Sequence, residues 1–118
     1  MNRDEFERVV AAALDGLPGE VAALLENIAV VVEDDPSDDD LASVGLDPET
    51  ETLFGLYHGV AMPERGASYG NVLPDRIVIY RRPLLEACGD RAELVREIRD
   101  TVIHEVGHYF GLGDDDLP

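Results

Sequence analysis

Two of the chain's three histidines stand four residues apart in the stretch HEVGHYFGLGDDD, residues 104–116. On a helix, residues i and i+4 lie one above the other, so His104 and His108 can bind one metal ion together. The side chain of Glu105 is turned by about 100° from that of His104, so its carboxylate can stand beside the ion without binding it. This H-E-x-x-H spacing is typical of zinc hydrolase sites.

A third ligand is expected from the chain that follows the second histidine. Gly111 can adopt the left-handed conformation that ends a helix, and Asp114 lies three residues beyond it. Two surface histidines beside acidic groups would explain the shorter pattern. The full pattern H-E-x-x-H-x-x-G-x-x-D, however, should arise by chance in roughly one such chain in ten thousand. We therefore predict a metal site formed by His104, His108 and Asp114. His58, in a strand-like segment, is the alternative third ligand.

The histidines are expected on a long helix over residues 91–110, with Asp90 and Glu93 placed to cap its start. Apolar residues at helical spacing form one wide arc of this helix: Leu94, Val95, Ile98, Val102, Ile103, Val106, Tyr109 and Phe110. The residues outside the arc include Glu97, Thr101, His104 and His108. The spacing predicts that the helix packs on a core through its arc and presents the histidines from its other side.

The segments before this helix indicate an α+β fold. Residues 3–17 are predicted to form an amphipathic helix, with Asn2 and Glu5 at the spacing of a capping box. A short helix is expected through residues 21–27, and the acidic segment EDDPSDDD, residues 33–40, is expected to be a solvated loop. Apolar runs predict three strands, the first of them buried because of its valines, at residues 28–33, 53–60 and 76–82.

Composition limits the class of protein and its partners. The chain of 118 residues has the length of one domain, spanning residues 1–118. Its formal net charge is −17, with 26 acidic residues against nine arginines, so we expect it to bind neither nucleic acid nor an anionic membrane. No segment approaches the roughly 18 apolar residues needed to cross a bilayer. The single cysteine, Cys88, cannot form an internal disulfide. These features favour a cytoplasmic protein.

The stretch HEVGHYFGLGD resembles the zinc signature of metzincin-type proteases, with aspartate in place of the usual third histidine. Nearly the whole chain resembles the minimal zincin-like metallopeptidases, a family of short bacterial proteins, also through FGLYHGVAMPERG and VLPDRIVIYRRPLLE. The resemblance implies a compact zincin-like α+β domain, with a small mixed sheet packed against helices and the active-site helix near the C-terminus. It also implies a zinc ion held by His104, His108 and Asp114, with Glu105 as the catalytic acid/base.

The function expected from this resemblance is that of a zinc-dependent peptidase, in which Glu105 activates a zinc-bound water to hydrolyse a peptide bond. The alternative is a catalytically weak or inactive metal-binding protein that binds peptides or a partner protein. An extended peptide or protein substrate would pair with strand 53–60 or strand 76–82. Since the sequence ends at Pro118, we expect no methionine-turn subdomain, and a partner protein could complete the cleft. Candidate donors to the reaction intermediate are Tyr57, Tyr69, Tyr80 and Arg65, whereas Tyr109 is expected to point toward the apolar arc.

Overall fold

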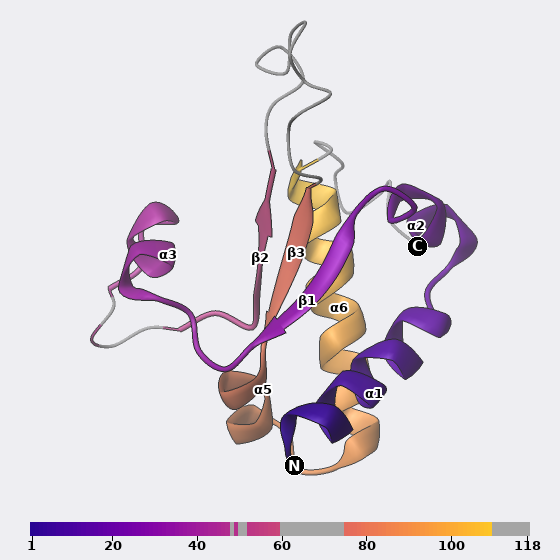
Figure 1. Cartoon of the computed structure of the whole chain (residues 1–118), viewed down its shortest axis with the longest axis horizontal. Helices are drawn as coiled ribbons and strands as arrows, with labels where there is room; N and C mark the ends of the chain where they lie inside the picture. Colours follow the sequence, from indigo (N-terminus) through magenta and orange to yellow (C-terminus); the bar gives the residue numbers. More distant parts are fainter. Residues whose placement is uncertain (48, 50–51, 60–74, 110–118) are drawn as a thin grey trace, which may run out of the picture.

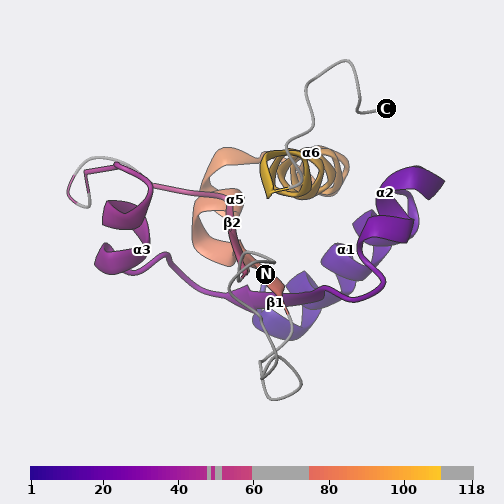
Figure 2. The ribbon, with the colours of Figure 1, turned by 90° about the horizontal axis from the view of Figure 1, so that it is seen from above.

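The computed structural model describes residues 1–47, 49, 52–59 and 75–109. The elements, in chain order, are α1 (Arg3–Asp15), α2 (Gly19–Leu24), β1 (Ala29–Glu33), α3 (Asp38–Ser43), β2 (Gly55–His58), β3 (Arg76–Tyr80), α5 (Arg81–Ala87) and α6 (Arg91–Tyr109). Figure 1 shows α6 running along the three strands, and α3 stands apart from α1 and α6 there and in Figure 2. Among the described residues, no helix has both the length and the apolar character needed to cross a membrane.

β3 is the central strand of a three-stranded sheet with the order β1-β3-β2. β1 pairs with β3 in parallel, with Ala29 opposite Arg76, whereas β2 pairs with β3 antiparallel, with Gly55 opposite Ile79. The parallel pair is joined by a long crossover, as parallel strands require, and this crossover contains α3 and β2. The predicted α+β fold with a small mixed sheet is therefore confirmed, and β1 and β2 are the outer strands of the described sheet.

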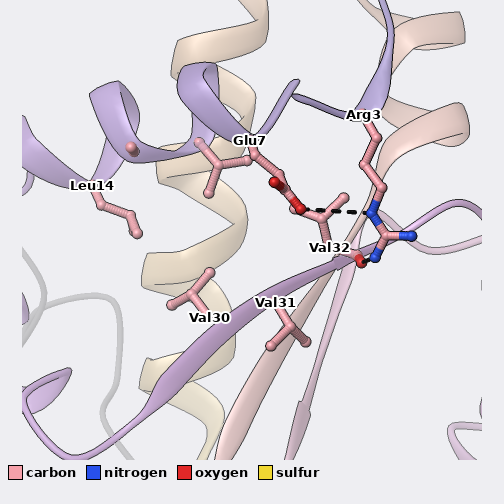
Figure 3. Close-up of a pocket in the computed structure, with 8 residues that line it drawn as sticks. Arg3, Glu7, Leu14, Val30, Val31 and Val32 are labelled. Atoms are coloured by element: carbon pink, nitrogen blue, oxygen red, sulfur yellow. Dashed lines mark hydrogen bonds and ion pairs between the residues drawn. The ribbon is translucent and has the colours of Figure 1, made fainter. Parts of the chain in front are cut away.

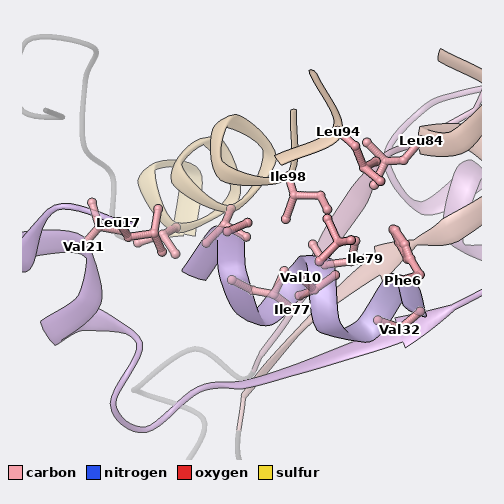
Figure 4. Packing of buried hydrophobic residues seen from close by; sticks show 14 residues of the cluster. Phe6, Val10, Leu17, Val21, Val32, Ile77, Ile79, Leu84, Leu94 and Ile98 are labelled. Atoms are coloured by element: carbon pink, nitrogen blue, oxygen red, sulfur yellow. The ribbon is translucent and has the colours of Figure 1, made fainter. Parts of the chain in front are cut away.

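An apolar core joins α1 and α6 to one face of the sheet (Figure 4). The buried hydrophobic side chains of α6 are those of Leu94, Ile98, Val102 and Val106, all within the predicted arc. From β3, the alternate residues Ile77 and Ile79 meet them, because side chains two apart on a strand share a face. The residues of α1 in this core are Phe6, Val9, Val10 and Ala13. The helical and strand spacings together therefore account for the layer of helices on this face.

Both predicted helix caps are confirmed. The side chain of Asn2 accepts a hydrogen bond from the backbone N–H of Glu5 at 2.8 Å, and Asp90 does the same for Glu93 at 2.8 Å. Each cap satisfies a backbone donor that the first turn of the helix leaves unpaired. The third predicted strand is shorter than expected, because α5 begins directly after Tyr80.

The acidic segment is the solvated loop that its composition predicts only over residues 34–37, which are exposed or half-buried. Its last residues begin α3, where the Ser37 hydroxyl accepts a hydrogen bond from the backbone N–H of Asp40 at 3.0 Å. Aspartates in the first turn also suit the positive end of the helix dipole. Earlier in the segment, Arg81 Nε donates to Asp34 Oδ1 at 2.9 Å, and this hydrogen bond holds the pKa of Asp34 below its usual value. Capping and ion pairing therefore give the segment its structure.

β1 is not the buried strand that its valine run predicts. Val32 is only 6% exposed but Val31 is 36% exposed, because one face of this outer strand packs on the core and the other does not. At the start of α1, the Arg3 guanidinium donates to the carbonyl of Val32 in β1 (Figure 3). A charged side chain at an outer strand opposes pairing with another chain.

Replacing Ile98 by alanine should lower the free energy of unfolding by about 2–5 kcal/mol, because the lost side chain leaves a cavity in the core. Urea unfolding followed by circular dichroism measures this change. Val31→Ala is the matched control, since Val31 lies on the uncovered face of β1; it should change the free energy by less than about 1 kcal/mol. Equal losses in the two variants would contradict the assignment of the core.

Candidate active site

α6 carries both histidine positions on one continuous helix. The backbone of His108 lies one turn beyond that of His104. The side chain of His104 is exposed, whereas those of Val102 and Val106, two residues to either side, are fully buried. His104 therefore lies outside the apolar arc, as predicted. The side chain of His108 and the whole of Asp114 lie outside the described residues, and their roles stay predictions.

Glu105 reaches from α6 to the edge of the sheet. Its Oε1 accepts a hydrogen bond from the backbone N–H of Tyr57 in β2 at 3.1 Å. The strand pairing explains why this N–H is turned toward the helix. Tyr80 donates its backbone N–H to the carbonyl of Phe54 at 2.9 Å, and in an antiparallel ladder only every second residue bonds to the partner strand. Gly55 and Tyr57 therefore direct their N–H and carbonyl groups away from β3.

The close approach of β2 to α6 depends on Gly55. A Cβ atom at this position would lie 2.6 Å from Cγ2 of Thr101 and 3.1 Å from the carbonyl oxygen of Val78. Thr101 precedes Glu105 by about one helical turn, and Gly55 precedes Tyr57 by two strand residues. These two steps are similar in length, about 6 Å on a helix and about 7 Å on a strand. The strand and the helix therefore meet at two successive points.

β2 is the strand that can offer an edge beside Glu105. Of the two strands considered for peptide binding, β3 is paired on both sides, which excludes it. Among the described residues β2 pairs with β3 alone, and its outward backbone groups face α6 at Glu105. One side of the protein thus brings together the exposed His104, the half-buried Glu105 and the edge of β2.

This arrangement coincides with a match to known proteins. A family model described as zincin-like metallopeptidase matches residues 25–118, which include β2 and the whole histidine motif. The chain belongs to the zincin-like metallopeptidase family. The predicted family is confirmed, and a peptidase-related function is the one that the family indicates. Zinc is the usual metal where two histidines of an H-E-x-x-H helix act as ligands.

A solved structure supports the same fold for this zincin-like protein. It is that of a conserved hypothetical protein from Thermo thermophilus, which is 22% identical and aligns with a TM-score of 0.59. The alignment covers 93% of this chain and 94% of that one. At this identity the likeness concerns the fold alone. No curated protein sequence matches the chain.

Tyr57 makes a second contact that the sequence does not indicate. Its hydroxyl donates to Oδ2 of Asp75 at 2.9 Å, and Asp75 is only 9% exposed. Tyr57 stands opposite Ile77 in the ladder, so Asp75 is its diagonal neighbour on the same face of the sheet. The contact could be foreseen only from the register of β2 and β3, because nothing in the local sequence around Asp75 marks it.

His58 and Tyr80 are directed to α3 instead of the histidine motif. His58 Nε2 lies 4.0 Å from Oδ1 of Asp40, and the Tyr80 hydroxyl donates to Oδ2 of the same residue at 3.0 Å. Burial and this hydrogen bond raise the pKa of Tyr80. Within the described ranges, no group of three His, Cys, Asp or Glu side chains is placed to hold a metal ion. The other candidate donors, Tyr69 and Arg65, lie outside those ranges, as does the side chain of Tyr109.

A cavity of about 420 Å³ between α1 and β1 lies apart from this site (Figure 3). Its lining includes Glu7, Leu14 and Val30, and it flanks the outer strand at the other side of the sheet from β2. Cys88 also stands outside the site, since it ends α5 and packs on the core, and burial raises the pKa of its thiol. Neither feature adds to the candidate active site.

Gly55→Ala should destabilise the fold by about 1–3 kcal/mol, because the new methyl group overlaps Thr101 and β2 must move away from α6. Thermal or urea unfolding measures the loss. Adding Thr101→Ser removes the overlapping Cγ2 atom and should recover part of it. Gly19→Ala is the control, since a Cβ there meets nothing within 4 Å. Full stability in Gly55→Ala would contradict the close contact of strand and helix.

Proposed function

We propose that this zincin-like protein is a zinc-dependent peptidase with Glu105 as its catalytic acid/base. The observation that carries the proposal is the position of the Glu105 carboxylate, which stands at the outward side of β2 and one residue from the exposed His104. A peptidase needs this arrangement, because the acid/base group must meet the metal and an extended substrate at one place.

The donor set assigned to the metal is chemically suited to zinc. Two imidazoles and one carboxylate, from His104, His108 and Asp114, fit a four-coordinate site with one open position. The exposure of His104 on the side of α6 away from the core supports this assignment. Zinc bound there would polarise a substrate carbonyl and lower the pKa of a bound water to about 7.

Glu105 moves the proton in this mechanism. While Oε1 accepts the N–H of Tyr57, the carboxylate would take the proton from the attacking water and return it to the leaving amine. The anchoring N–H belongs to the strand and not to the helix. The carboxylate is therefore held in a fixed position relative to the edge where the substrate binds.

The backbone of β2 defines how a peptide would bind. An extended peptide can add to a free strand edge through main-chain hydrogen bonds. The outward groups of β2 are those of Gly55 and Tyr57, and the N–H of Tyr57 is already bonded to Glu105. A substrate peptide would thus add along the outer edge of β2, beside the Glu105 carboxylate.

His104→Ala and His108→Ala should each abolish stoichiometric zinc binding, because two protein ligands do not make a stable zinc site. Asp114→Ala should bind zinc more weakly than the wild type but more tightly than the histidine variants. Zinc titration by calorimetry measures these affinities, with Asp115→Ala as the unchanged control. Intact affinity in Asp114→Ala together with lost affinity in His58→Ala would reassign the third ligand.

Glu105→Gln should keep zinc and the fold while lowering hydrolysis by about 10²- to 10⁴-fold, because an amide cannot take up the proton. The glutamine oxygen can still accept the N–H of Tyr57. Cleavage of a diverse peptide library by zinc-loaded protein, analysed by mass spectrometry, measures the activity. Equal cleavage by both proteins would exclude Glu105 as the acid/base. Cleavage by neither, at full zinc content, would favour the alternative of a metal-binding protein without turnover.

A further inference from the structure

Asp75 is the one charged side chain that is buried in the described part of the chain, at 9% exposure. Burial of a carboxylate is costly unless hydrogen bonds compensate for the lost water. The hydroxyl of Tyr57 provides one such bond at 2.9 Å. The backbone of Asp75 is fixed as well, because its carbonyl accepts the N–H of Ala29 at 3.0 Å. Asp75 is thus held to β1 by its main chain and to β2 by its side chain.

Tyr57 connects this buried carboxylate to α6. Its hydroxyl bonds to Asp75, and its backbone N–H bonds to Glu105 at 3.1 Å. A tyrosine side chain has only two main rotatable bonds, so a fixed hydroxyl restrains the backbone to which the ring is attached. The position of the Tyr57 N–H therefore depends on the contact at the far end of the ring.

β2 needs such a restraint because it is short and lies at the edge of the described sheet. It has four residues, Gly55–His58, and pairs with β3 alone in the described structure. Short elements of this kind open locally more easily than a central strand. The hydrogen bond between Tyr80 and Phe54 lies at one end of the β2–β3 ladder. Asp75 lies diagonally across from Tyr57, near the other end of this ladder.

We infer that Asp75 is a positioning residue, which acts through the hydroxyl of Tyr57 to keep the Tyr57 N–H on Glu105 and so fixes the Glu105 carboxylate beside the histidine motif. The importance of this carboxylate rests on the proposed peptidase function, but the chain of contacts does not. Asp75 acts in this arrangement through Tyr57 and not on the reacting atoms. It affects the position of the Glu105 carboxylate, which is the proposed proton acceptor.

The sheet supplies a matched control for this inference. Tyr80 also donates its hydroxyl to an aspartate, Asp40, at 3.0 Å. Its backbone N–H, however, bonds to Phe54 and makes no contact with Glu105. Tyr80→Phe therefore removes the same kind of hydrogen bond from the same sheet without releasing Glu105.

The first test measures hydrogen exchange of the backbone amide at position 57 by NMR in the zinc-loaded protein. Tyr57→Phe should speed this exchange by about 3- to 10-fold, the range expected for one lost hydrogen bond. Tyr80→Phe should leave it unchanged, and the amides of Ile77 and Ile79 serve as the reference for global opening. No change in Tyr57→Phe, or an equal change in Tyr80→Phe, would overturn the inference. If Tyr57→Phe fails to fold, Asp75→Asn replaces it and should show a smaller increase, because its hydrogen bond is no longer charge-assisted.

The second test separates this inference from the proposed function. In a wild type that cleaves peptide, Tyr57→Phe should lower kcat by about 3- to 10-fold at unchanged zinc content and with KM within about twofold. Tyr80→Phe should keep the wild-type kcat. Faster exchange at position 57 with an unaltered kcat would refute the positioning role. If the wild type has no hydrolytic activity, the proposed function fails, and the exchange measurement alone decides whether Asp75 holds Glu105 in place.

Discussion

The contact between α6 and β2 determines the geometry of the candidate site. Glu105 can accept the N–H of Tyr57 only if the strand lies directly against the helix, and the missing side chain of Gly55 allows this beside Thr101. The core sets the position of the helix, because fully buried residues such as Ile98 fill the space between α6 and the sheet. Protein interiors are close-packed, so a shift of α6 would also displace β2. The same packing that stabilises the fold therefore places the carboxylate.

The acidic residues of this chain play two physically different parts. Asp34 and Asp35 bond to Arg81 and Arg82, each at 2.9 Å, and these pairs lie near the surface. Exposed ion pairs of this kind contribute only about 0–1 kcal/mol, so they orient the segment before α3 more than they stabilise the fold. Asp75 differs because it is buried, and leaving a buried acceptor without its donor costs more than the bond itself contributes. Among the acidic residues that the structure describes, Asp75 is thus the one whose loss should disturb the fold most.

The parts of the structure that the sequence predicts well are those set by local spacing. The long helix, its apolar arc and the caps at Asn2 and Asp90 all follow from residues within two turns of each other. The burial of β1 was mispredicted because it depends on partners far away in the chain, whereas the helical end of the acidic segment was missed although its cap at Ser37 is local. Dependence on distant partners also explains why the geometry of the site could not be predicted. The motif indicates His104 and Glu105, but Glu105 and Tyr57 are 48 residues apart, and only the pairing of β2 with β3 shows that they meet.

A carboxylate held by the strand has a consequence for substrate binding in the proposed peptidase. The substrate would add to the outer edge of β2, the same short strand whose N–H at Tyr57 anchors Glu105. Any pull of the bound peptide on β2 would therefore be transmitted to the proton acceptor. Asp75 opposes such movement from the opposite end of the Tyr57 side chain, where it is fixed by the sheet itself. In the proposed peptidase, peptide binding and placement of the acid/base would thus be coupled through Tyr57, and a peptide that pairs in the correct register would leave Glu105 where the reaction needs it.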